Sequence, residues 1–402
     1  MRKRVVITGV GVVSSLGIGT DAFWQGLCEG RCGIRPIETI GVDGLKIAIA
    51  AEVPDYIPGE YFDHKRLKTL DRCSQFALLA AREAMADSGL DISQQQTDRT
   101  ATIVGSAIGG NTTVDDGYKK LYGDGNPRVN PMTIPRVMIS APPSQISMEL
   151  GLRGPTFAVS SACSSSNHAI GEAFRMLQHG YADIAVTGGC EASISFGMMK
   201  SWQALRVISA DTCRPFSLDR SGMVIGEGAG MLVLETLDHA RARGAEIYAE
   251  LAGFGMSADA EHLIMPSKKG ACRAMQAALD DAKMAASDID YINAHGTGTP
   301  VNDVSETAAI HDVFSEHARE LLVSSTKSMH GHALGAAGSL EGIATVLALR
   351  HGILPPTVNF TQADPDCDLD YIVNTAREKK IDMAISNSFA FGGLNSVLAF
   401  RA

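Results

Sequence analysis

One cysteine stands where an apolar strand pattern changes directly into a helical pattern. Cys163 follows the stretch Thr156-Phe-Ala-Val-Ser160 and precedes a run whose apolar residues recur at helical spacing. The first backbone N–H groups of a helix point toward a residue in this position, and with the helix dipole they favour a thiolate. The pattern therefore predicts a nucleophile with a depressed pKa. Taken alone, it is equally compatible with a small buried residue that packs against a neighbouring element.

Two histidines in the second half of the chain lie where predicted strands end. His295 stands in Asn293-Ala-His-Gly-Thr-Gly-Thr-Pro300, so that Thr297 and Thr299 supply hydroxyl groups two and four residues further on. His332 stands in Met329-His-Gly-His-Ala-Leu-Gly335 and is predicted to open a helix rich in small residues. A lone histidine is usually structural. Two histidines at strand ends, each beside glycine and hydroxyl residues, indicate a functional site.

The elements that must position these residues alternate between short β-rich runs and helical patterns. This alternation indicates an α/β fold in which helices cover the sheets. The predicted strands span residues 4–8, 101–104, 157–160, 184–187, 231–234, 289–292, 321–324, 381–385 and 397–400. The predicted helices span residues 74–88, 167–179, 237–243, 272–285, 304–313 and 339–350. Residues 112–135, rich in glycine and proline, are the expected mobile insertion.

A short internal echo suggests that the chain contains two related halves. Ser160-Ser-Ala-Cys163 leads into a helix that closes with Leu177-Gln-His-Gly180, and Ser324-Ser-Thr-Lys327 leads toward one that closes with Leu349-Arg-His-Gly352. We interpret this as a duplication. Residues 1–250 would form the half with the cysteine and residues 251–402 the half with both histidines. The match is short, so coincidence remains an alternative.

Length and composition are those of an ordinary enzyme. The chain has 402 residues and a net charge of −10, which argues against general affinity for nucleic acid. No apolar window is long enough to cross a membrane. The N-terminal apolar run is cut by Gly9 and Gly11, which predicts a buried first strand that enters a turn rather than a signal peptide.

The spacing of the cysteines predicts free thiols. The eight cysteines include no CxxC pair, so we expect neither a disulfide framework nor a metal site. Free thiols are typical of a reducing, cytoplasmic compartment.

The motifs resemble those of the β-ketoacyl-acyl carrier protein synthases, the elongating condensing enzymes of the thiolase superfamily. The resemblance rests on Cys163, His295 and His332, with Lys327 and Glu341 around the last of these. It covers essentially all 402 residues and includes the closing motif 387–395. It implies a thiolase-like fold, with two duplicated α/β halves that form a layered αβαβα core.

The resemblance also implies roles for the reactive residues. Cys163 would carry the acyl chain as a thioester. His295 and His332 would donate hydrogen bonds through Nε2 to the enolate that forms when malonyl-carrier protein loses CO2. The backbone N–H groups of Cys163 and Phe391 would hold the oxyanion of the condensation step. The reaction would extend the chain by two carbons, as in fatty acid synthesis.

A polar network is expected behind the histidines. By the same resemblance, Lys327 would tune both imidazoles together with Asp303, Glu306 and Glu341. The alternative for each of these four residues is an ordinary surface ion pair.

Further contacts to the substrate are carried over in the same way. Thr297 and Thr299 resemble the pair that holds the phosphopantetheine arm. Phe391, between the small residues Ala390 and Gly392, resembles the gate that swings when the acyl chain is loaded. Three apolar residues are assigned to the acyl pocket: Ile108, Met199 and Phe389. At Ile108 an apolar residue is equally expected of any core.

The expected partner is acyl carrier protein, which is acidic, as is this chain. Docking therefore requires a local basic patch. The candidates are Lys65, Arg66, Lys68, Arg72 and Arg206, with Lys268 and Lys269 as further options. The alternative is an ordinary solvated helix face. The resemblance implies a homodimer formed along a sheet edge, with a heterodimer as the alternative. It implies no cofactor, because the carrier protein brings the phosphopantetheine arm.

Several positions depart from the housekeeping pattern of the family. Ser164-Ser165-Ser166 replaces the usual Ala-Thr or Thr-Ser mixture, and His330 and Leu394 each stand where a threonine is expected. The segment 191–216 is also shorter. These changes favour relatives that serve specialised acyl chains, such as nodulation-type, polyene or polyketide synthases.

Other classes fit less well. A thiolase needs a second reactive cysteine in its C-terminal glycine motif, and no cysteine follows Cys367. A chain-length-factor subunit would lack the nucleophile. A dinucleotide-binding motif would need a third glycine after Gly9 and Gly11.

Overall fold

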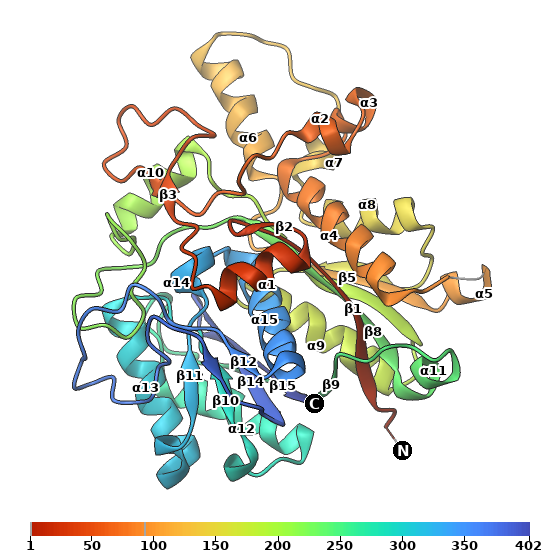
Figure 1. The fold of residues 1–402 in the computed structure, drawn as a ribbon. Helices are drawn as coiled ribbons and strands as arrows, with labels where there is room; N and C mark the ends of the chain where they lie inside the picture. Colours follow the sequence, from red (N-terminus) through yellow and green to blue (C-terminus); the bar gives the residue numbers. More distant parts are fainter. Residues whose placement is uncertain (1, 92–93) are drawn as a thin grey trace.

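The computed structural model describes residues 2–91 and 94–402. An 11-stranded mixed sheet runs through the molecule, and two small two-stranded sheets lie beside it (Figure 1). The strands are β1 (Val5–Ser14), β2 (Gly17–Ile18), β3 (Arg35–Pro36), β4 (Ile49–Ala50), β5 (Thr100–Gly105), β6 (Thr156–Val159), β7 (Ile184–Glu191), β8 (Gly228–Thr236), β9 (Ala249–Ala258), β10 (Tyr291–Asn293), β11 (Leu322–Ser324), β12 (Ile353–Leu354), β13 (Arg377–Glu378), β14 (Met383–Ala390) and β15 (Leu394–Arg401).

Helices cover both faces of the large sheet. They are α1 (Thr20–Cys28), α2 (Pro58–Tyr61), α3 (His64–Leu67), α4 (Arg72–Ser88), α5 (Gln94–Thr97), α6 (Asn111–Tyr118), α7 (Thr133–Val137), α8 (Ala141–Leu150), α9 (Ser165–Gln178), α10 (Phe196–Leu205), α11 (Leu237–Ala242), α12 (Lys268–Ala282), α13 (Pro300–Phe314), α14 (Lys327–His330) and α15 (Ala337–His351). Shorter helical turns are η1 (Lys119–Gly123), η2 (Ala286–Asp288), η3 (Ser315–Arg319) and η4 (Leu334–Ala336). Each predicted strand and helix overlaps an observed one, whereas β9, α1, α8 and α10 were not predicted.

The two halves of the sheet repeat one strand order. The order is β6-β5-β7-β8-β1 in the first half and β11-β10-β14-β15-β9 in the second. In both halves the first three strands are parallel and the last two are antiparallel to their neighbours. A short antiparallel pairing of β1 with β9 joins the halves. The predicted fold class, a thiolase-like fold of two duplicated halves, is therefore confirmed.

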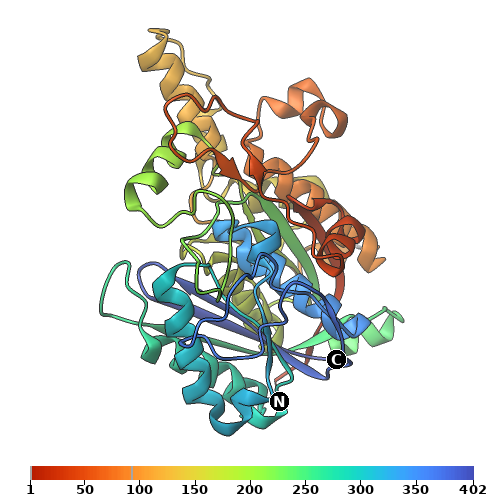
Figure 2. The same ribbon diagram turned by 60° about the vertical axis from the view of Figure 1, so that its left-hand side comes forward.

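The helices form three layers around the two half-sheets. Helices α9 and α15 pack against each other between the half-sheets, where the largest apolar cluster lies. Helix α4 covers the outer face of β1, β7 and β8, and α12 covers that of β9 and β15 (Figures 1 and 2). The expected αβαβα layering follows from this arrangement.

Glycines in the first strand allow the outer helix to approach closely. A Cβ at Gly9 would lie 2.2 Å from the carbonyl oxygen of Ala84, and one at Gly11 would lie 2.1 Å from that of Ala80. Strand β1 continues through both glycines to Ser14. The prediction that they end the strand in a turn is wrong, because their small size serves packing against α4.

A close contact between strand glycines and an outer helix is also present in the second half. A Cβ at Gly253 would lie 2.6 Å from the carbonyl oxygen of Ala278, and one at Gly255 would lie 2.1 Å from that of Ala274. These glycines belong to β9 and the alanines to α12. Strands β1 and β9 are equivalent in the duplication, so the paired glycines mark the same contact twice.

The segment expected as a mobile insertion contains regular structure. Helix α6, the π-helical turn η1 and helix α7 lie within or beside it, and the arm projects from the body of the molecule (Figures 1 and 2). Its exposed apolar side chains are Tyr118, Tyr122, Val129, Met132, Ile134 and Met138. Among the described residues, no helix has both the length and the apolarity that a bilayer crossing requires.

Candidate active site

Cys163 lies at a sharp turn between a strand and a helix, as the sequence predicts. Strand β6 ends at Val159 and α9 begins at Ser165. The preceding Ala162 has φ +51°, a strained conformation for a residue with a side chain. The turn presents the thiol to a buried cavity, and Cys163 is only 8% exposed.

Burial changes the expected ionisation of this thiol. Removal from water raises the pKa of Cys163 to about 11, although Lys327 and the backbone N–H groups of Phe391 and Cys163 itself oppose the shift. The prediction of a depressed pKa is therefore wrong. The N–H groups act in the expected direction, but burial by surrounding elements outweighs them.

His332 presents a hydrogen-bond donor to the cavity. The backbone N–H of Leu334 donates to its Nδ1 at 3.2 Å, so Nδ1 carries the lone pair and the ring proton must sit on Nε2. This Nε2 has no partner among the described residues. Burial, followed by the charge of Lys327, holds the pKa of His332 well below its usual range. The ring is thus a neutral donor. It precedes η4 rather than opening a long helix directly, because α15 starts at Ala337.

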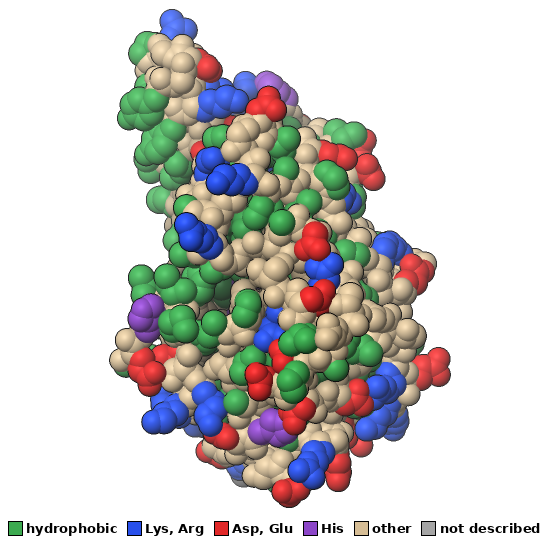
Figure 3. All heavy atoms as spheres, turned by 90° about the vertical axis from the view of Figure 1, so that its left-hand side faces the viewer, with side chains coloured by type: hydrophobic (Ala, Val, Ile, Leu, Met, Phe, Trp, Pro, Cys, Tyr) green, Lys and Arg blue, Asp and Glu red, His purple; other side chains and the backbone are tan. Residues whose placement is uncertain are grey.

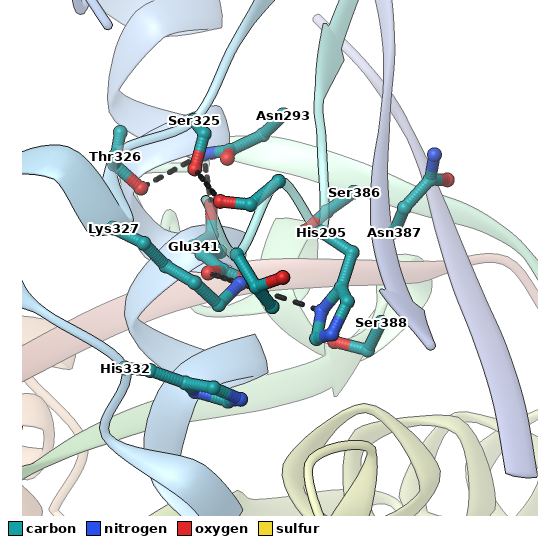
Figure 4. Close-up of polar contacts among 12 residues, drawn as sticks. Asn293, His295, Ser325, Thr326, Lys327, His332, Glu341, Ser386, Asn387 and Ser388 are labelled. Carbon is teal, nitrogen blue, oxygen red and sulfur yellow. Dashed lines mark hydrogen bonds and ion pairs between the residues drawn. The ribbon is translucent and has the colours of Figure 1, made fainter. Parts of the chain in front are cut away.

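His295 has the same tautomer as His332, with its ring proton on Nε2. It follows β10, and the ammonium of Lys327 lies 3.5 Å from its Nδ1 (Figure 4). A lysine ammonium can only donate, so the ring proton of His295 also sits on Nε2. Burial and then Lys327 hold its pKa well below the usual range. The two imidazole rings are nearly perpendicular, with the edge of one toward the face of the other and their centroids 5.6 Å apart.

Lys327 forms a fully buried ion pair with Glu341. Its ammonium donates to Glu341 Oε1, and neither side chain is exposed to solvent. Burial raises the pKa of Glu341 to about 7, and Lys327 opposes this shift. The surface ion pair considered as an alternative is thereby excluded for both residues.

Asp303 and Glu306 support the loop that carries His295. Glu306 accepts hydrogen bonds from the backbone N–H groups of His295 and Gly296, both at 2.8 Å. Asp303 accepts from that of Gly298 at 3.2 Å, and burial raises its pKa to about 6. Both carboxylates are buried and are not surface partners.

The cavity in front of the cysteine has a volume of about 280 Å³. Its lining includes Cys163, His295, His332, Thr297, Thr299, Phe389, Phe391 and Arg206. The hydroxyl oxygens of Thr297 and Thr299 lie 2.9 Å apart. Ile108 and Met199 do not line the cavity and pack in a neighbouring apolar cluster with Ile194 and Leu334. Figure 3 shows the face that carries α10 and α13, where apolar side chains gather beside a hollow.

Phe391 occupies the tip of the hairpin between β14 and β15. Gly392 and Gly393 follow it with φ of +82° and +68°, conformations that glycine adopts without strain. Its ring lies 6.4 Å from that of Trp202. The role of gate stays a prediction.

Some of the predicted docking residues form ion pairs with carboxylates of the same chain. Lys65 and Lys68 are exposed on or beside α3, whereas Arg66 binds Glu149 at 3.2 Å. The Arg72 guanidinium donates to Glu227 at 2.8 Å and lies over the ring of Phe76. Arg72 is therefore engaged within its own chain.

The other docking candidates are differently placed. Arg206 is exposed and lines the cavity mouth at the end of α10, and Lys268 binds Asp312 at 2.7 Å. In Figure 1, α3 and α10 lie on different sides of the upper part of the molecule. The α3 lysines are thus separate from the mouth of their own chain's cavity.

Two polar features near the site were not foreseen. Asn395 donates to Asp259 at 2.6 Å, and both line the cavity. His330 is buried, donates from Nδ1 to the carbonyl of Gly331 at 2.9 Å, and lies 3.0 Å from the Thr326 hydroxyl. No local pattern marks Asp259, because its partner lies far along the chain.

Several buried oxygens in this part of the molecule lack a protein partner. Among the described residues, no protein partner meets Asn293 Oδ1, Glu341 Oε2, Ser386 Oγ, Asn387 Oδ1 or Ser388 Oγ (Figure 4). Within residues 2–91 and 94–402, no cluster of three or more His, Cys, Asp or Glu side chains could hold a metal ion.

A cysteine at a strand-to-helix turn, faced by two neutral histidine donors on a duplicated αβαβα fold, defines an acyl-transferring condensing enzyme of the thiolase class. The chain belongs to the β-ketoacyl synthase family. The model of the Beta-ketoacyl synthase N-terminal domain matches residues 2–240, and that of the C-terminal domain matches residues 248–361.

Individual relatives match this chain over all or nearly all of both lengths. Nodulation protein E of Rhizobium sp. (strain N33) is 50% identical over 401 residues, which cover 100% of both chains. The 3-oxoacyl-[acyl-carrier-protein] synthase 2 of Staphylococcus aureus (strain COL) is 42% identical over 406 residues, covering 99% of this chain and 98% of that one. The ishigamide ketosynthase/chain length factor superposes with a TM-score of 0.96 at 38% identity, covering 100% of both chains.

The raised pKa of Cys163 predicts a steep pH dependence of its alkylation. Below a pKa of about 11 the thiolate fraction grows with pH, so the rate with iodoacetamide should rise about tenfold per pH unit from about pH 7 to 9. Peptide mass mapping follows the label on Cys163, and exposed Cys32 serves as the internal comparison. A plateau below pH 8 would show that the pKa is depressed after all.

Proposed function

We propose that this chain is a 3-oxoacyl-[acyl-carrier-protein] synthase. It would lengthen a Cys163-bound acyl chain by two carbons through decarboxylative condensation with malonyl-carrier protein. One observation carries this proposal: a single buried cavity contains a thiol and two neutral imidazole rings that both present Nε2–H.

The first step loads the acyl chain. The sulfur of Cys163 attacks the thioester carbon of the acyl-carrier protein, and the bond to the pantetheine sulfur breaks. The proton of the Cys163 thiol leaves with the departing pantetheine thiolate. The N–H groups of Cys163 and Phe391, which already lie against the sulfur, are suited to hold the oxyanion of this step.

The second step forms the carbon–carbon bond. Malonyl-carrier protein loses CO2, and the negative charge moves onto its thioester oxygen, where His295 and His332 donate through Nε2. The resulting carbanion attacks the Cys163 thioester, and the freed thiolate of Cys163 takes up a proton. Neutral rings favour this chemistry, because charged ones would bind the malonyl carboxylate in the ground state.

The substrate itself supplies the reactive arm, so the proposal includes no separate cofactor. The paired hydroxyls of Thr297 and Thr299 in the cavity lining would bind the phosphopantetheine arm. Eight free cysteines support a reducing, cytoplasmic location.

Replacement of the nucleophile tests the central proposal. Cys163→Ala should lower formation of 3-oxoacyl product from acyl- and malonyl-carrier protein by more than about 10³-fold, because the thioester can no longer form. Release of CO2 from malonyl-carrier protein should persist, since both histidines remain. Mass spectrometry follows the product, and Cys32→Ala is the matched control outside the cavity. Persistent product in Cys163→Ala would overturn the assignment.

Carrier-protein docking is proposed at the basic residues near α3 and at Arg206. Charge reversal by Lys65→Glu/Lys68→Glu, or by Arg206→Glu, should raise KM for carrier protein by about tenfold while kcat changes little, because rim charges act mainly on association. Lys379→Glu/Lys380→Glu, exposed beside β13, is the matched control for the double variant. An unchanged KM in the α3 variant would remove α3 from the docking surface.

A homodimer is proposed along the edge of β6. Among the described residues this strand pairs on one side only, its Phe157 is 36% exposed, and the nearby arm exposes further apolar side chains. Light scattering on the purified chain should give twice the monomer mass of 42.5 kDa. A monomer that dimerises only with a related subunit would favour the heterodimer.

A second candidate is the same reaction in a specialised pathway. The 50% identity to a nodulation protein over the whole chain and the match to an ishigamide ketosynthase support it, as do the departures at Ser164, His330 and Leu394. The mass of the acyl group trapped on Cys163 in the native host would distinguish the two pathways.

A further inference from the structure

The residue after the nucleophile bonds to both strands of the β14–β15 hairpin, whose tip carries Phe391. The hydroxyl oxygen of Ser164 lies 2.9 Å from the carbonyl oxygen of Ser388 and 2.7 Å from that of Leu394. Ser388 belongs to β14 and Leu394 begins β15, so the two carbonyls lie on either side of the tip that carries Phe391. One buried hydroxyl proton is thus shared between the two strands.

This hydroxyl does not serve its own helix. Ser164 holds the N-cap position of α9, where a serine usually accepts a hydrogen bond from the first turn. Here the side chain makes no capping bond and donates to the distant hairpin instead. Neither helix capping nor local turn geometry therefore accounts for its orientation.

The bond matters because two separate elements supply the oxyanion donors. The N–H of Cys163 comes from the turn before α9, and the N–H of Phe391 comes from the hairpin tip. A shift of either element by a fraction of an ångström would separate the two donors.

The other contacts of the hairpin tip lead elsewhere. The N–H of Gly392 donates to the carbonyl of Leu263 at 2.7 Å, and the carbonyl of Gly393 accepts from the N–H of Asp259 at 2.9 Å. Both tie the tip to the loop after β9. Asn167 contacts the carbonyl of Ser386, deeper in β14, at the longer distance of 3.5 Å. Ser164 is therefore the close side-chain link between the base of the tip and the nucleophile turn.

We propose that Ser164 is a positioning residue that holds the β14–β15 hairpin against the nucleophile turn and keeps the N–H groups of Cys163 and Phe391 in register. It fixes the base of the hairpin, whereas the bonds of Gly392 and Gly393 to Leu263 and Asp259 hold the tip against the loop after β9. The inference rests on the proposed function and adds a residue that acts only through these two donors.

The test separates the two half-reactions. The full chain carrying Ser164→Ala is compared with wild type and with Ser396→Ala. Ser396 is a fully buried serine of β15 whose hydroxyl has no partner among the described residues. Acylation of Cys163 is followed by intact mass under single-turnover conditions, using saturated acyl chains from butanoyl to hexadecanoyl on carrier protein. The chain that wild type takes up fastest is used for the variants. Release of CO2 from malonyl-carrier protein alone reports the histidine donors.

Ser164→Ala should slow acylation at saturating carrier protein by about 10- to 100-fold with little change in half-saturation, because donor geometry and not binding is lost. Its CO2 release should stay within about twofold of wild type, since the histidine donors keep their geometry, and Ser396→Ala should match wild type in both assays. Unchanged acylation in Ser164→Ala would overturn the inference, and an equal loss in both assays would show a merely structural role. If wild type takes up no acyl chain, the proposed function fails instead.

Discussion

The site depends on the burial of one ion pair, Lys327 with Glu341. Burying an ammonium is costly unless a counter-charge accompanies it, so the two residues must fold together. Once in place, the ammonium opposes the rise that burial causes in the pKa of Cys163, and it helps to keep His295 and His332 neutral. The same charge therefore acts on the nucleophile and on both donors. Removal of either partner would leave an unpaired charge in the centre of the molecule.

The duplication explains how residues from both halves meet. Strands β6 and β11 hold equivalent places in the two half-sheets, and the turns after them carry Cys163 and Lys327. The sequence echo between Ser160-Ser-Ala-Cys163 and Ser324-Ser-Thr-Lys327 is thus a structural equivalence. One of these two equivalent turns carries the nucleophile, and the other carries the charge that acts on it.

The architecture and the reactive residues could be predicted from the sequence, because short motifs and hydrophobic periodicity are local. The errors arose where the role of a residue depends on packing against elements that are distant in the sequence. Gly9 and Gly11 read as turn residues, and β9 was missed although it contains the equivalent pair Gly253 and Gly255. In both places the glycine makes room for a helix remote in sequence.

Within the site, the sign of the Cys163 shift could not be predicted for the same reason. Local N–H groups lower the pKa, but elements from the far end of the chain bury the thiol. The task of Ser164 was equally hidden. Its partners are two backbone carbonyls more than 200 residues away, at Ser388 and Leu394, and carbonyls leave no mark in a sequence.

The orientation of the imidazole protons has a consequence for metal ions. A cysteine and two histidines around one cavity offer the ligand types that zinc and copper prefer. Coordination requires a lone pair, however, and both Nε2 atoms present a hydrogen. Leu334 and Lys327 already occupy the Nδ1 atoms to which the protons would have to move. The arrangement that favours an enolate thereby leaves neither imidazole able to coordinate a metal ion unless its ring proton first moves.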